Sequence, residues 1–467
     1  MPAEPAPERF PGEPATTLTH ATIAETASAI RSGATTAESL VEAYLERIAR
    51  LDPAINAFIA VTAEQARADA RGADRELAAG RSRGVLHGVP ISIKDIIDVR
   101  GTATTCASRV RTTQPARRDA TLVARLRDAG AIFIGKTNLH EFAFGTTNED
   151  SAFGPVHHPL DASRSPGGSS GGSAASVLAG MAVASIGTDT GGSVRIPAAA
   201  CGLVGLKPEP GEVPIDGVIP LSATLDHVGP ICRSVDDAVT LYNVMRGARD
   251  SAAPADVDLR SVRFGVLRGY FTALLEPQVA QAFDQACARL SDAGATLEEV
   301  NVPHAGDIAP VYLHIVLAEA AAAHATTLEN RADDYTPNVR IRLEMGRYML
   351  AEDYVRALRG RELLTREVDA AVTGQTALLL PSLPLTAPKL GATTVTLSGA
   401  EEPIRNAMLR LTQLFNITGH PAITLPCAFA GTPLPIGVQL AGARHKTLEL
   451  LGVARAVERH LVRPTPS

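Results

Sequence analysis

The stretch of residues 164–201 constrains the fold of this chain more than any other. It carries two glycine-flanked serine clusters, Gly167–Ser173 and Gly191–Ser193, separated by a run of small and apolar residues. Glycine permits left-handed turns and lets backbone N–H groups approach a ligand closely. The run between the clusters predicts a helix over about 173–182 and then a short strand over about 184–187. The fold must therefore hold two serine-bearing loops on either side of a buried strand.

The serine clusters fit three other patterns less well. A flexible Gly/Ser linker would not be interrupted by an apolar strand. Gly167–Gly172 has the glycine spacing of a Walker A loop, but Ser173 stands where that motif needs lysine. Gly167–Gly171 fits G-x-S-x-G, yet a Ser-Arg-Ser-Pro segment precedes it instead of a buried strand. Serine hydroxyls beside bare N–H donors instead favour acyl transfer, because an oxyanion needs donors already in place.

Strand and helix patterns alternate along most of the chain. We expect strands at 89–93, 131–134, 262–267, 296–302, 377–380, 422–425 and 436–440, with helices between most of them. This alternation predicts an α/β fold in which helices cover both faces of the sheet. Residues 1–16, rich in Pro, Ala and Glu, are expected to be a disordered tail, and 17–467 a single domain. Within it, residues 303–375 form a helical subregion, with helices expected at 311–328 and 338–350.

Two helix starts near the N-terminus have capping-box patterns. They are Thr22-x-x-Glu25 and Thr35-x-x-Glu38, and the second helix is expected to end at Asp52-Pro53.

Composition and charge argue against several classes of protein. The net charge is −6, and no stretch combines dense Lys/Arg with aromatic residues, so direct nucleic-acid binding is not expected. No signal peptide and no run of 18 apolar residues is found, so no membrane association is expected. The five scattered cysteines contain no C-x-x-C pair, which favours reduced thiols and a cytoplasmic location. No metal motif is present, so neither a metal nor another cofactor is expected.

A nucleophilic serine needs a base. The histidines nearest the serine loops in sequence are His140, His157, His158 and His227. None lies in a recognisable triad motif, but triads assemble in space, so a histidine base stays open. Lys94 is the stronger candidate because a lysine at the end of an apolar strand costs desolvation energy unless it has a role. The alternative for Lys94 is a half-buried ion pair with its neighbour Asp95.

Six blocks of the chain, in order, resemble the amidase signature family, and the resemblance covers about residues 22–457. The blocks are the 164–201 stretch and Gly88–Asp95, Gly135–Phe142, Gly205–Pro208, Leu225–Pro230 and Pro435–Leu440. The resemblance implies a large mixed β-sheet covered by helices, with residues 303–375 helping to roof the substrate pocket. It also implies hydrolysis of C–N bonds through an acyl-enzyme or carbamoyl-enzyme intermediate.

Residue by residue, the resemblance makes Lys94 the catalytic lysine, Ser169 the bridging serine and Ser193 the nucleophile. Neutral Lys94 would take a proton from Ser169, which takes one from Ser193. In the family the peptide bond between Gly168 and Ser169 is cis. Because burial lowers the pKa of a lysine, we expect activity to rise toward alkaline pH. The oxyanion donors would be N–H groups of Thr190, Gly191, Gly192 and Ser193, with Gly168, Ser170, Asp189 and Arg195 in support.

The resemblance implies the type of bond that is cleaved, a C–N bond, but implies the substrate less narrowly. Phe142, Ala143, Phe144 and Gly145 match positions beside the acyl pocket in the family, and with Tyr312 they suggest an apolar or aryl amide or carbamate (urethane). They could equally be core residues. We therefore expect a small-molecule amide or carbamate hydrolase, acting as a monomer or homodimer.

A rival interpretation, of another class, is the glutaminase A subunit of a tRNA-dependent amidotransferase complex. Those subunits usually carry an Arg/Tyr-bearing turn after Gly-Leu-Lys-Pro, and Glu209–Gly217 lacks both residues. This departure favours the stand-alone hydrolase. A catalytically dead binding protein is disfavoured because Lys94, Ser169 and Ser193 are all present.

Overall fold

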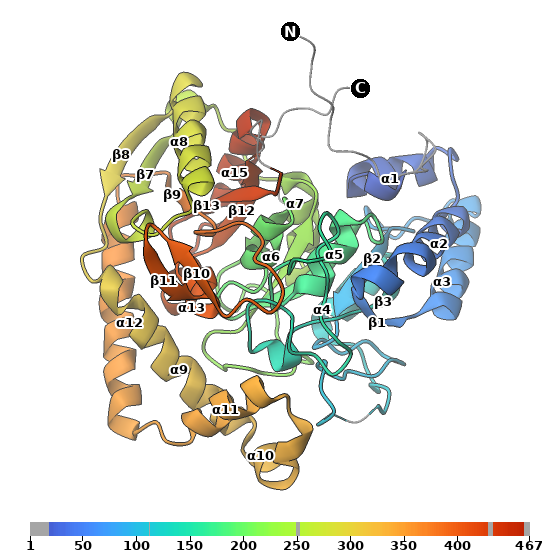
Figure 1. The fold of residues 1–467 in the computed structure, drawn as a ribbon. Helices are drawn as coiled ribbons and strands as arrows, with labels where there is room; N and C mark the ends of the chain where they lie inside the picture. Colours follow the sequence, from blue (N-terminus) through green and yellow to red (C-terminus); the bar gives the residue numbers. More distant parts are fainter. Residues whose placement is uncertain (1–17, 112, 249–252, 428–432, 462–467) are drawn as a thin grey trace.

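The computed structural model describes residues 18–111, 113–248, 253–427 and 433–461 (Figure 1). The tail predicted for residues 1–16 lies outside these ranges. One large sheet runs through the described chain in the order β1-β3-β2-β4-β6-β5-β12-β13-β9-β7-β8. Its strands are β1 (Phe58–Val61), β2 (Pro90–Lys94), β3 (Ile132–Thr137), β4 (Ala184–Asp189), β5 (Val204–Lys207), β6 (His227–Cys232), β7 (Arg263–Leu267), β8 (Thr296–Val300), β9 (Ala377–Pro381), β12 (Ala422–Cys427) and β13 (Ile436–Ala441).

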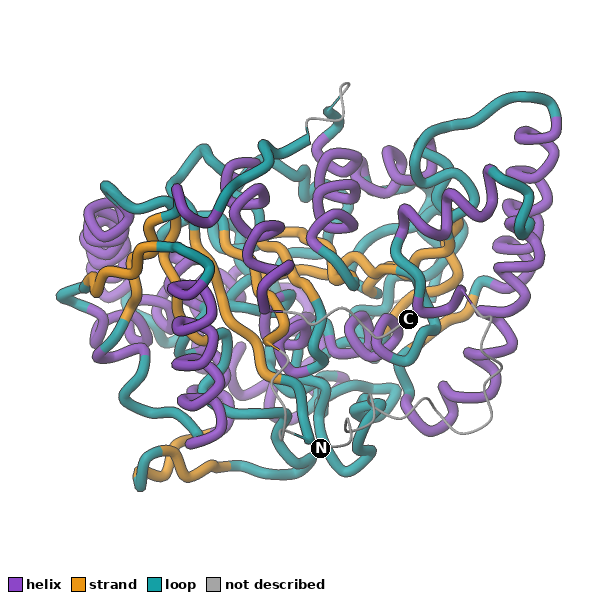
Figure 2. Tube along the Cα trace, turned by 90° about the horizontal axis from the view of Figure 1, so that it is seen from above, coloured by secondary structure: helices purple, strands orange, loops and turns teal. Residues whose placement is uncertain are grey.

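The sheet is mixed, with a parallel group on each side of an antiparallel centre. β3, β2 and β4 pair in parallel, and so do β9, β7 and β8. The pairs from β4 through β6, β5, β12 and β13 to β9 are antiparallel. Figure 2 shows helices on both sides of these strands, which confirms the predicted α/β class. Every residue of β2, β3 and β4 is buried, as expected for strands covered on both faces.

Several predicted helices have different ends, and the helices at 195–200, 404–409 and 413–417 were not predicted. The described α-helices outside residues 303–375 are α1 (Ile23–Arg31), α2 (Ala37–Ile55), α3 (Ala63–Ala78), α4 (Thr121–Asp128), α5 (Gly171–Leu178), α6 (Arg195–Ala200), α7 (Val235–Arg246), α8 (Pro277–Asp292), α13 (Ile404–Leu409), α14 (Gln413–Ile417) and α15 (Thr447–Leu461). The helix between the serine clusters thus begins two residues earlier than expected and is shorter.

Of the two predicted capping boxes, one is confirmed and one is wrong. Thr22 and Glu25 hydrogen-bond each other's backbone N–H groups at the start of α1. The N-cap of α2 is Thr36, whose side chain accepts a hydrogen bond from the N–H of Ser39. α2 also continues through Pro53 to Ile55, and just beyond the helix end the carboxylate of Asp52 accepts the N–H of Ala57 at 2.7 Å.

The region 303–375 contains four α-helices, α9 (Ile308–Ala323), α10 (Ala325–Arg331), α11 (Pro337–Gly346) and α12 (Ala351–Val372). The single helix expected over 311–328 is therefore two, and α12 was not expected. In Figure 1, α9 and α12 lie at the left of the view and α10 and α11 at the bottom, whereas α2 and α3 lie at the right. The stretch Ala305–Ala323 could cross a membrane by length and composition, but half of it is buried in the protein. α9 packs against α11 and α12, as a core helix does.

A short hairpin lies outside the main sheet. Strands β10 (Thr394–Leu397) and β11 (Ala400–Pro403) are joined by Ser398 and Gly399, both with positive φ. A two-residue turn of this kind matches the twist of the paired strands.

Candidate active site

The site forms where two neighbouring parallel strands end. β2 ends at Lys94 and β4 ends at Asp189, and the register pairs Ile93 with Ile186. Parallel strands bring their carboxyl ends to one edge of a sheet. The loop after β4 carries Ser193, and the loop before α5 carries Ser169 and Ser170. Three segments that are far apart in sequence therefore meet at this edge.

Lys94 is fully buried among hydroxyl groups. Its Nζ donates to Ser169 Oγ at 2.8 Å, to Ser170 Oγ at 2.9 Å and to Thr188 Oγ1 at 2.8 Å. Burial lowers the pKa of Lys94 to about 7, although the carboxylates of Asp189 and Asp226 act to raise it. Near neutral pH a large fraction of Lys94 is therefore uncharged and able to accept a proton.

Asp95 is not the partner of Lys94. Its carboxylate lies 2.7 Å from Lys136 Nζ instead, and both side chains of that pair are buried. It also accepts the backbone N–H of Thr105 at 3.0 Å. The alternative in which Lys94 and Asp95 form an ion pair is therefore wrong. Lys94 is the last residue of β2 and Asp95 the first residue beyond it, and the two side chains have different partners.

Ser169 lies in a loop that is tightly packed on its N-terminal side. The Gly168–Ser169 peptide bond is cis. A Cβ on Gly168 would come within 2.8 Å of the backbone nitrogen of Asn148, so only glycine fits there. The N–H of His140 donates to the carbonyl of Ser169 at 3.1 Å, and this contact holds the loop against the segment after β3.

Ser193 lies directly beside this loop. The N–H of Ser170 donates to the carbonyl of Ser193 at 3.2 Å, and Ser193 is 5% exposed. Within the described parts of the chain, the hydroxyl of Ser193 makes no hydrogen bond. The same holds for the backbone N–H groups of Thr190, Gly191, Gly192 and Ser193. Four consecutive N–H donors beside a serine hydroxyl could stabilise a negatively charged oxygen.

A buried ion pair between two residues that flank the Ser193 loop stabilises this loop. Arg195 Nη2 lies 2.9 Å from Asp189 Oδ1, and both side chains are fully buried. Although burial opposes it, the guanidinium of Arg195 holds the pKa of Asp189 below its usual range. Arg195 also donates to the side chains of Gln439 and Asn416, both at 2.7 Å. The loop thus rests on a fully hydrogen-bonded pair.

Asp226 supports the same loop from another side. Its carboxylate accepts the hydroxyl of Thr190 at 2.6 Å and the N–H groups of Leu221 and Ser222 at 2.9 and 3.0 Å. Burial raises the pKa of Asp226 to about 6. Asp226 was part of a sequence block, but nothing in the sequence indicated that its charge would act on Lys94.

The histidines near the loops in sequence have other partners. His140 faces the carboxylate of Asp150 at 3.0 Å, and His157 and His158 contact backbone carbonyls. His227 Nδ1 lies 2.7 Å from the carbonyl of Leu225. Within the described residues, no histidine hydrogen-bonds a hydroxyl of Ser169 or Ser193, so the histidine-base alternative gains no support.

The proposed pocket residues have a more polar setting than expected. The ring of Phe142 packs on His324 and Tyr335, with centroids 4.4 and 5.5 Å away, and is a core contact. A Cβ on Gly145 would lie 2.1 Å from the ring of His140. The ring of Phe144 is flanked by the guanidinium groups of two arginines, Arg342 and Arg405, at 5.8 and 5.9 Å. Neither arginine was predicted from the sequence.

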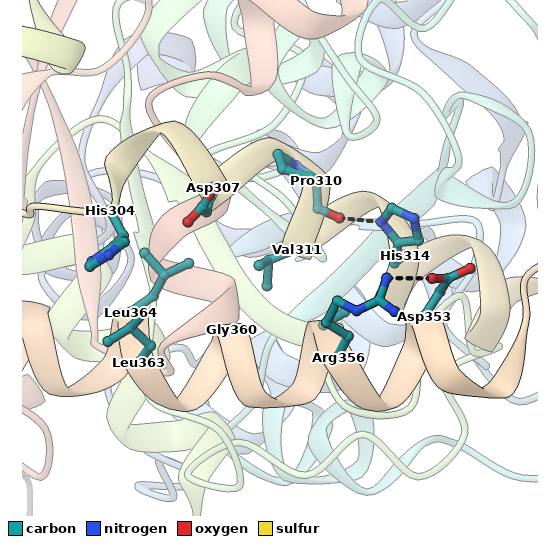
Figure 3. Close-up of a pocket in the computed structure, with 11 residues that line it drawn as sticks. His304, Asp307, Pro310, Val311, His314, Asp353, Arg356, Gly360, Leu363 and Leu364 are labelled. Atoms are coloured by element: carbon teal, nitrogen blue, oxygen red, sulfur yellow. Dashed lines mark hydrogen bonds and ion pairs between the residues drawn. The ribbon is translucent and has the colours of Figure 1, made fainter.

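A separate cavity of about 280 Å³ lies between α9 and α12 (Figure 3). Its lining includes His304, Val311, His314, Arg356 and Gly360, and none of the residues around Lys94 or Ser193. Among the described residues, no cluster of three or more His, Cys, Asp or Glu side chains is placed to hold a metal ion.

Comparison with known proteins agrees with this architecture. The model of the Amidase family matches residues 39–451, most of the chain. The A subunit of the glutamyl-tRNA(Gln) amidotransferase of Roseiflexus sp. (strain RS-1) is 38% identical, over 95% of this chain and 97% of its own length.

Two solved structures are also similar over nearly their full length. One, described as an amidase, has a TM-score of 0.90 and 37% identity, covering 94% of this chain and 100% of its own. Another, from work on a vestigial protein complex and the origins of an s-triazine catabolic enzyme, has a TM-score of 0.87 and 34% identity. It covers 93% of this chain and 97% of its own.

Fold and similarity together define a hydrolase of C–N bonds. The chain belongs to the Amidase family, with the amidase signature.

Proposed function

We propose that this chain hydrolyses the side-chain amide of glutamine, as the amidase subunit of a tRNA-dependent amidotransferase. The observation that carries this proposal is the 38% identity to the Roseiflexus amidotransferase subunit, which extends over 95% of this chain. This proposal differs from the prediction made from the turn Glu209–Gly217, which favoured a stand-alone hydrolase. A single altered turn is a local difference, whereas the similarity extends along the whole chain.

The proposed reaction uses the proton path of the site. Neutral Lys94 accepts the proton of Ser169, and Ser169 accepts that of Ser193 as its Oγ attacks the amide carbon. The N–H groups of Thr190 to Ser193 hold the resulting oxyanion, and removing one such donor typically costs about 10²–10³ in rate. The relay then reverses, the leaving nitrogen takes the proton and departs as ammonia, and Ser193 stays acylated. Water, activated through the same relay, hydrolyses the ester.

A second candidate is a stand-alone hydrolase of small amides or carbamates. It is favoured by the missing Arg and Tyr in Glu209–Gly217 and by the TM-score of 0.90 to a structure described as an amidase. This candidate needs no partner subunit, whereas the first predicts that activity depends on one.

The test is a substrate panel with the purified chain, alone and with co-expressed amidotransferase partner subunits. Ammonia release from glutamine, stimulated by the partners and absent in Ser193→Ala, is expected. Turnover of anilides or carbamates with none of glutamine, with or without partners, would replace the first candidate by the second. A neutral fluorophosphonate probe should label Ser193 under either candidate. Failure to label the folded protein both alone and with the partner subunits would contradict both.

A further inference from the structure

The carboxylate of Glu319 on α9 accepts four hydrogen bonds, from a loop on one side and a helix on the other. From the loop before β6 it accepts the hydroxyl of Ser222 at 2.5 Å, and the hydroxyl and backbone N–H of Thr224 at 2.8 and 3.0 Å. From α12 it accepts the hydroxyl of Tyr354 at 2.9 Å. Hydrogen bonds to a charged acceptor are stronger than those between neutral groups. Glu319 therefore joins this loop firmly to the helix pair α9 and α12.

Arg361 on α12 reinforces the same contact. Its guanidinium donates to the hydroxyl and to the carbonyl of Thr224 at 2.9 and 3.0 Å. Burial lowers the pKa of Arg361, and the charge of Glu319 acts in the opposite direction. Two opposite charges on neighbouring helices thus hold one exposed threonine of the loop. The helices fix the position of the loop as well as packing beside it.

Ser222 connects Glu319 to Asp226 within the same loop. The backbone N–H of Ser222 donates to the carboxylate of Asp226 at 3.0 Å, and its carbonyl accepts the N–H of Asp226 at 3.0 Å. Ser222 is fully buried, and its hydroxyl donates to Glu319. All of its polar groups are therefore engaged with these two acids. A displacement of Ser222 would move or release the carboxylate of Asp226.

Asp226 in turn contacts the oxyanion loop, residues 190–193. Its carboxylate accepts the hydroxyl of Thr190, whose backbone N–H is the first of the four proposed oxyanion donors. α9 also touches this loop directly, since a Cβ added to Gly191 would lie 2.4 Å from the hydroxyl oxygen of Tyr312. Tyr312 and Glu319 are seven residues apart on α9, so they lie on one face of the helix. That face therefore contacts the oxyanion loop at Gly191 and, through Glu319, at Thr190.

We propose that Glu319 is a positioning residue for the reaction at Ser193. It acts through Ser222 and Asp226, which hold Thr190 in the oxyanion loop. The inference rests on the proposed hydrolysis at Ser193 and holds equally for glutamine and for a small amide or carbamate. Oxyanion donors lower the barrier most when they are already fixed before the reaction. The helices α9 and α12 thus support the oxyanion loop, a role beyond the roof that the family resemblance predicts for this region.

Glu319→Ala and Ser222→Ala remove the two ends of the same hydrogen bond. Ser222→Ala leaves Glu319 its contacts with Thr224 and Tyr354, so it tests the link even if Glu319→Ala folds poorly. The readout is the rate at which a neutral fluorophosphonate labels Ser193, because this measurement needs no identified substrate. Each variant should label about tenfold more slowly than wild type, a low value for the loss of a hydrogen bond to a charged group. Glu319→Gln keeps an acceptor oxygen and should recover most of the loss.

Two further measurements distinguish positioning from a general loss of structure. In ammonia release from glutamine with the partner subunits, Glu319→Ala should lower kcat about tenfold and leave KM within about twofold, because the oxyanion forms only in the transition state. Thr190→Val removes the hydroxyl that Asp226 holds and keeps the N–H donor. Because the contacts act in series, adding Glu319→Ala to Thr190→Val should slow labelling by less than about twofold more.

Glu367→Ala is the matched control. Glu367 is also half-buried and lies on α12, where it accepts the backbone N–H of His304 at 2.9 Å, in the segment between β8 and α9. Its carboxylate thus joins α12 to a loop, as that of Glu319 joins α9 to one. Glu367→Ala should lower the free energy of unfolding, measured by urea midpoints, and leave the rate of Ser193 labelling unchanged.

The outcomes separate this inference from the proposed function. Labelling of wild type and both alanine variants at the same rate would overturn the positioning role and leave the hydrolase intact. A loss of equal size in Glu367→Ala would also overturn it, and so would effects of Glu319→Ala and Thr190→Val that multiply in the double variant. Failure of wild type to label, alone and with the partner subunits, would contradict the proposed function and overturn the inference with it.

Discussion

Two lysines, Lys94 at the end of β2 and Lys207 at the end of β5, are equally buried but have different neighbours. Burial is the largest cause of a lowered pKa in both, to about 7 in each case. Three hydroxyl groups surround Lys94, whereas Lys207 donates to the carbonyl of Pro208 at 2.9 Å. The charges acting on Lys207 include those of Arg195 and Asp189. Burial therefore makes both lysines ready to lose a proton, but only Lys94 has hydroxyl groups with which to exchange one.

The largest expected effect separates the two lysines by activity. Lys94→Met should lower kcat by about 10²–10⁴, because that is the usual contribution of a general base. Lys207→Met should keep kcat within about tenfold, because its amine touches no serine hydroxyl. Steady-state ammonia release measures both, with circular dichroism as the check on folding. A loss of similar size in Lys207→Met, with the fold intact, would show that burial rather than hydroxyl contact marks the important lysine.

The site around Lys94 shows how much could be predicted from the sequence. Lys94, Ser169 and Ser193 were singled out from motif order, and the structure brings Lys94 to Ser169 and the Ser193 loop next to it. Their catalytic roles stay predictions. The strand that delivers Lys94 was predicted from its alternating, β-branched residues. Local pattern and family resemblance were enough here because each motif is contained in a few adjacent residues.

What the sequence could not predict depends on contacts between distant segments. Arg342 and Arg405 lie on two helices and meet only through Phe144. On a helix, an arginine with a buried guanidinium has the same local sequence pattern as a solvated one. Strand β1 was missed for a related reason, since two of its four residues are exposed and its pairing to β3 fixes it.

The pH dependence of stability should not distinguish the two lysines. Both have a folded-state pKa of about 7 against an ordinary value of 10.5. Between these values the unfolded chain holds a proton that the folded chain lacks, so the free energy of unfolding rises with pH. Below about pH 7 both states are protonated and the contribution is constant at its lowest value. Each lysine should add about 1.4 kcal/mol per pH unit to this rise.

Replacing either lysine by Met should therefore flatten the rise between pH 7 and 10 by a similar amount. Urea midpoints at several pH values measure it. A flattening in one variant alone would mean that burial lowers the pKa of one lysine much more than that of the other.

The pH profile of activity should respond to Asp226, whose charge acts on Lys94, and not to Glu212, whose charge acts on Lys207. kcat/KM should rise with pH through about 7, as Lys94 loses its proton. The negative charge of Asp226 favours protonated Lys94, so Asp226→Asn should shift the rise to lower pH. Glu212→Gln is the control, because Glu212 acts on Lys207. A shift of similar size in Glu212→Gln would connect the two lysines electrostatically and remove the distinction between them.

The smallest effect concerns the two hydroxyl groups that contact Lys94 outside the proposed relay. Thr188→Val keeps the shape of the side chain and removes an acceptor 2.8 Å from Nζ, and Ser170→Ala removes one at 2.9 Å. Losing one such hydrogen bond costs about 1 kcal/mol, so each variant should lose about fivefold in kcat. Because the acceptors favour the charged amine, the rise in activity should also move to lower pH. A loss as large as that of Lys94→Met would place the substituted hydroxyl in the proton path, and Ser169 would then not be the sole bridge between Lys94 and Ser193.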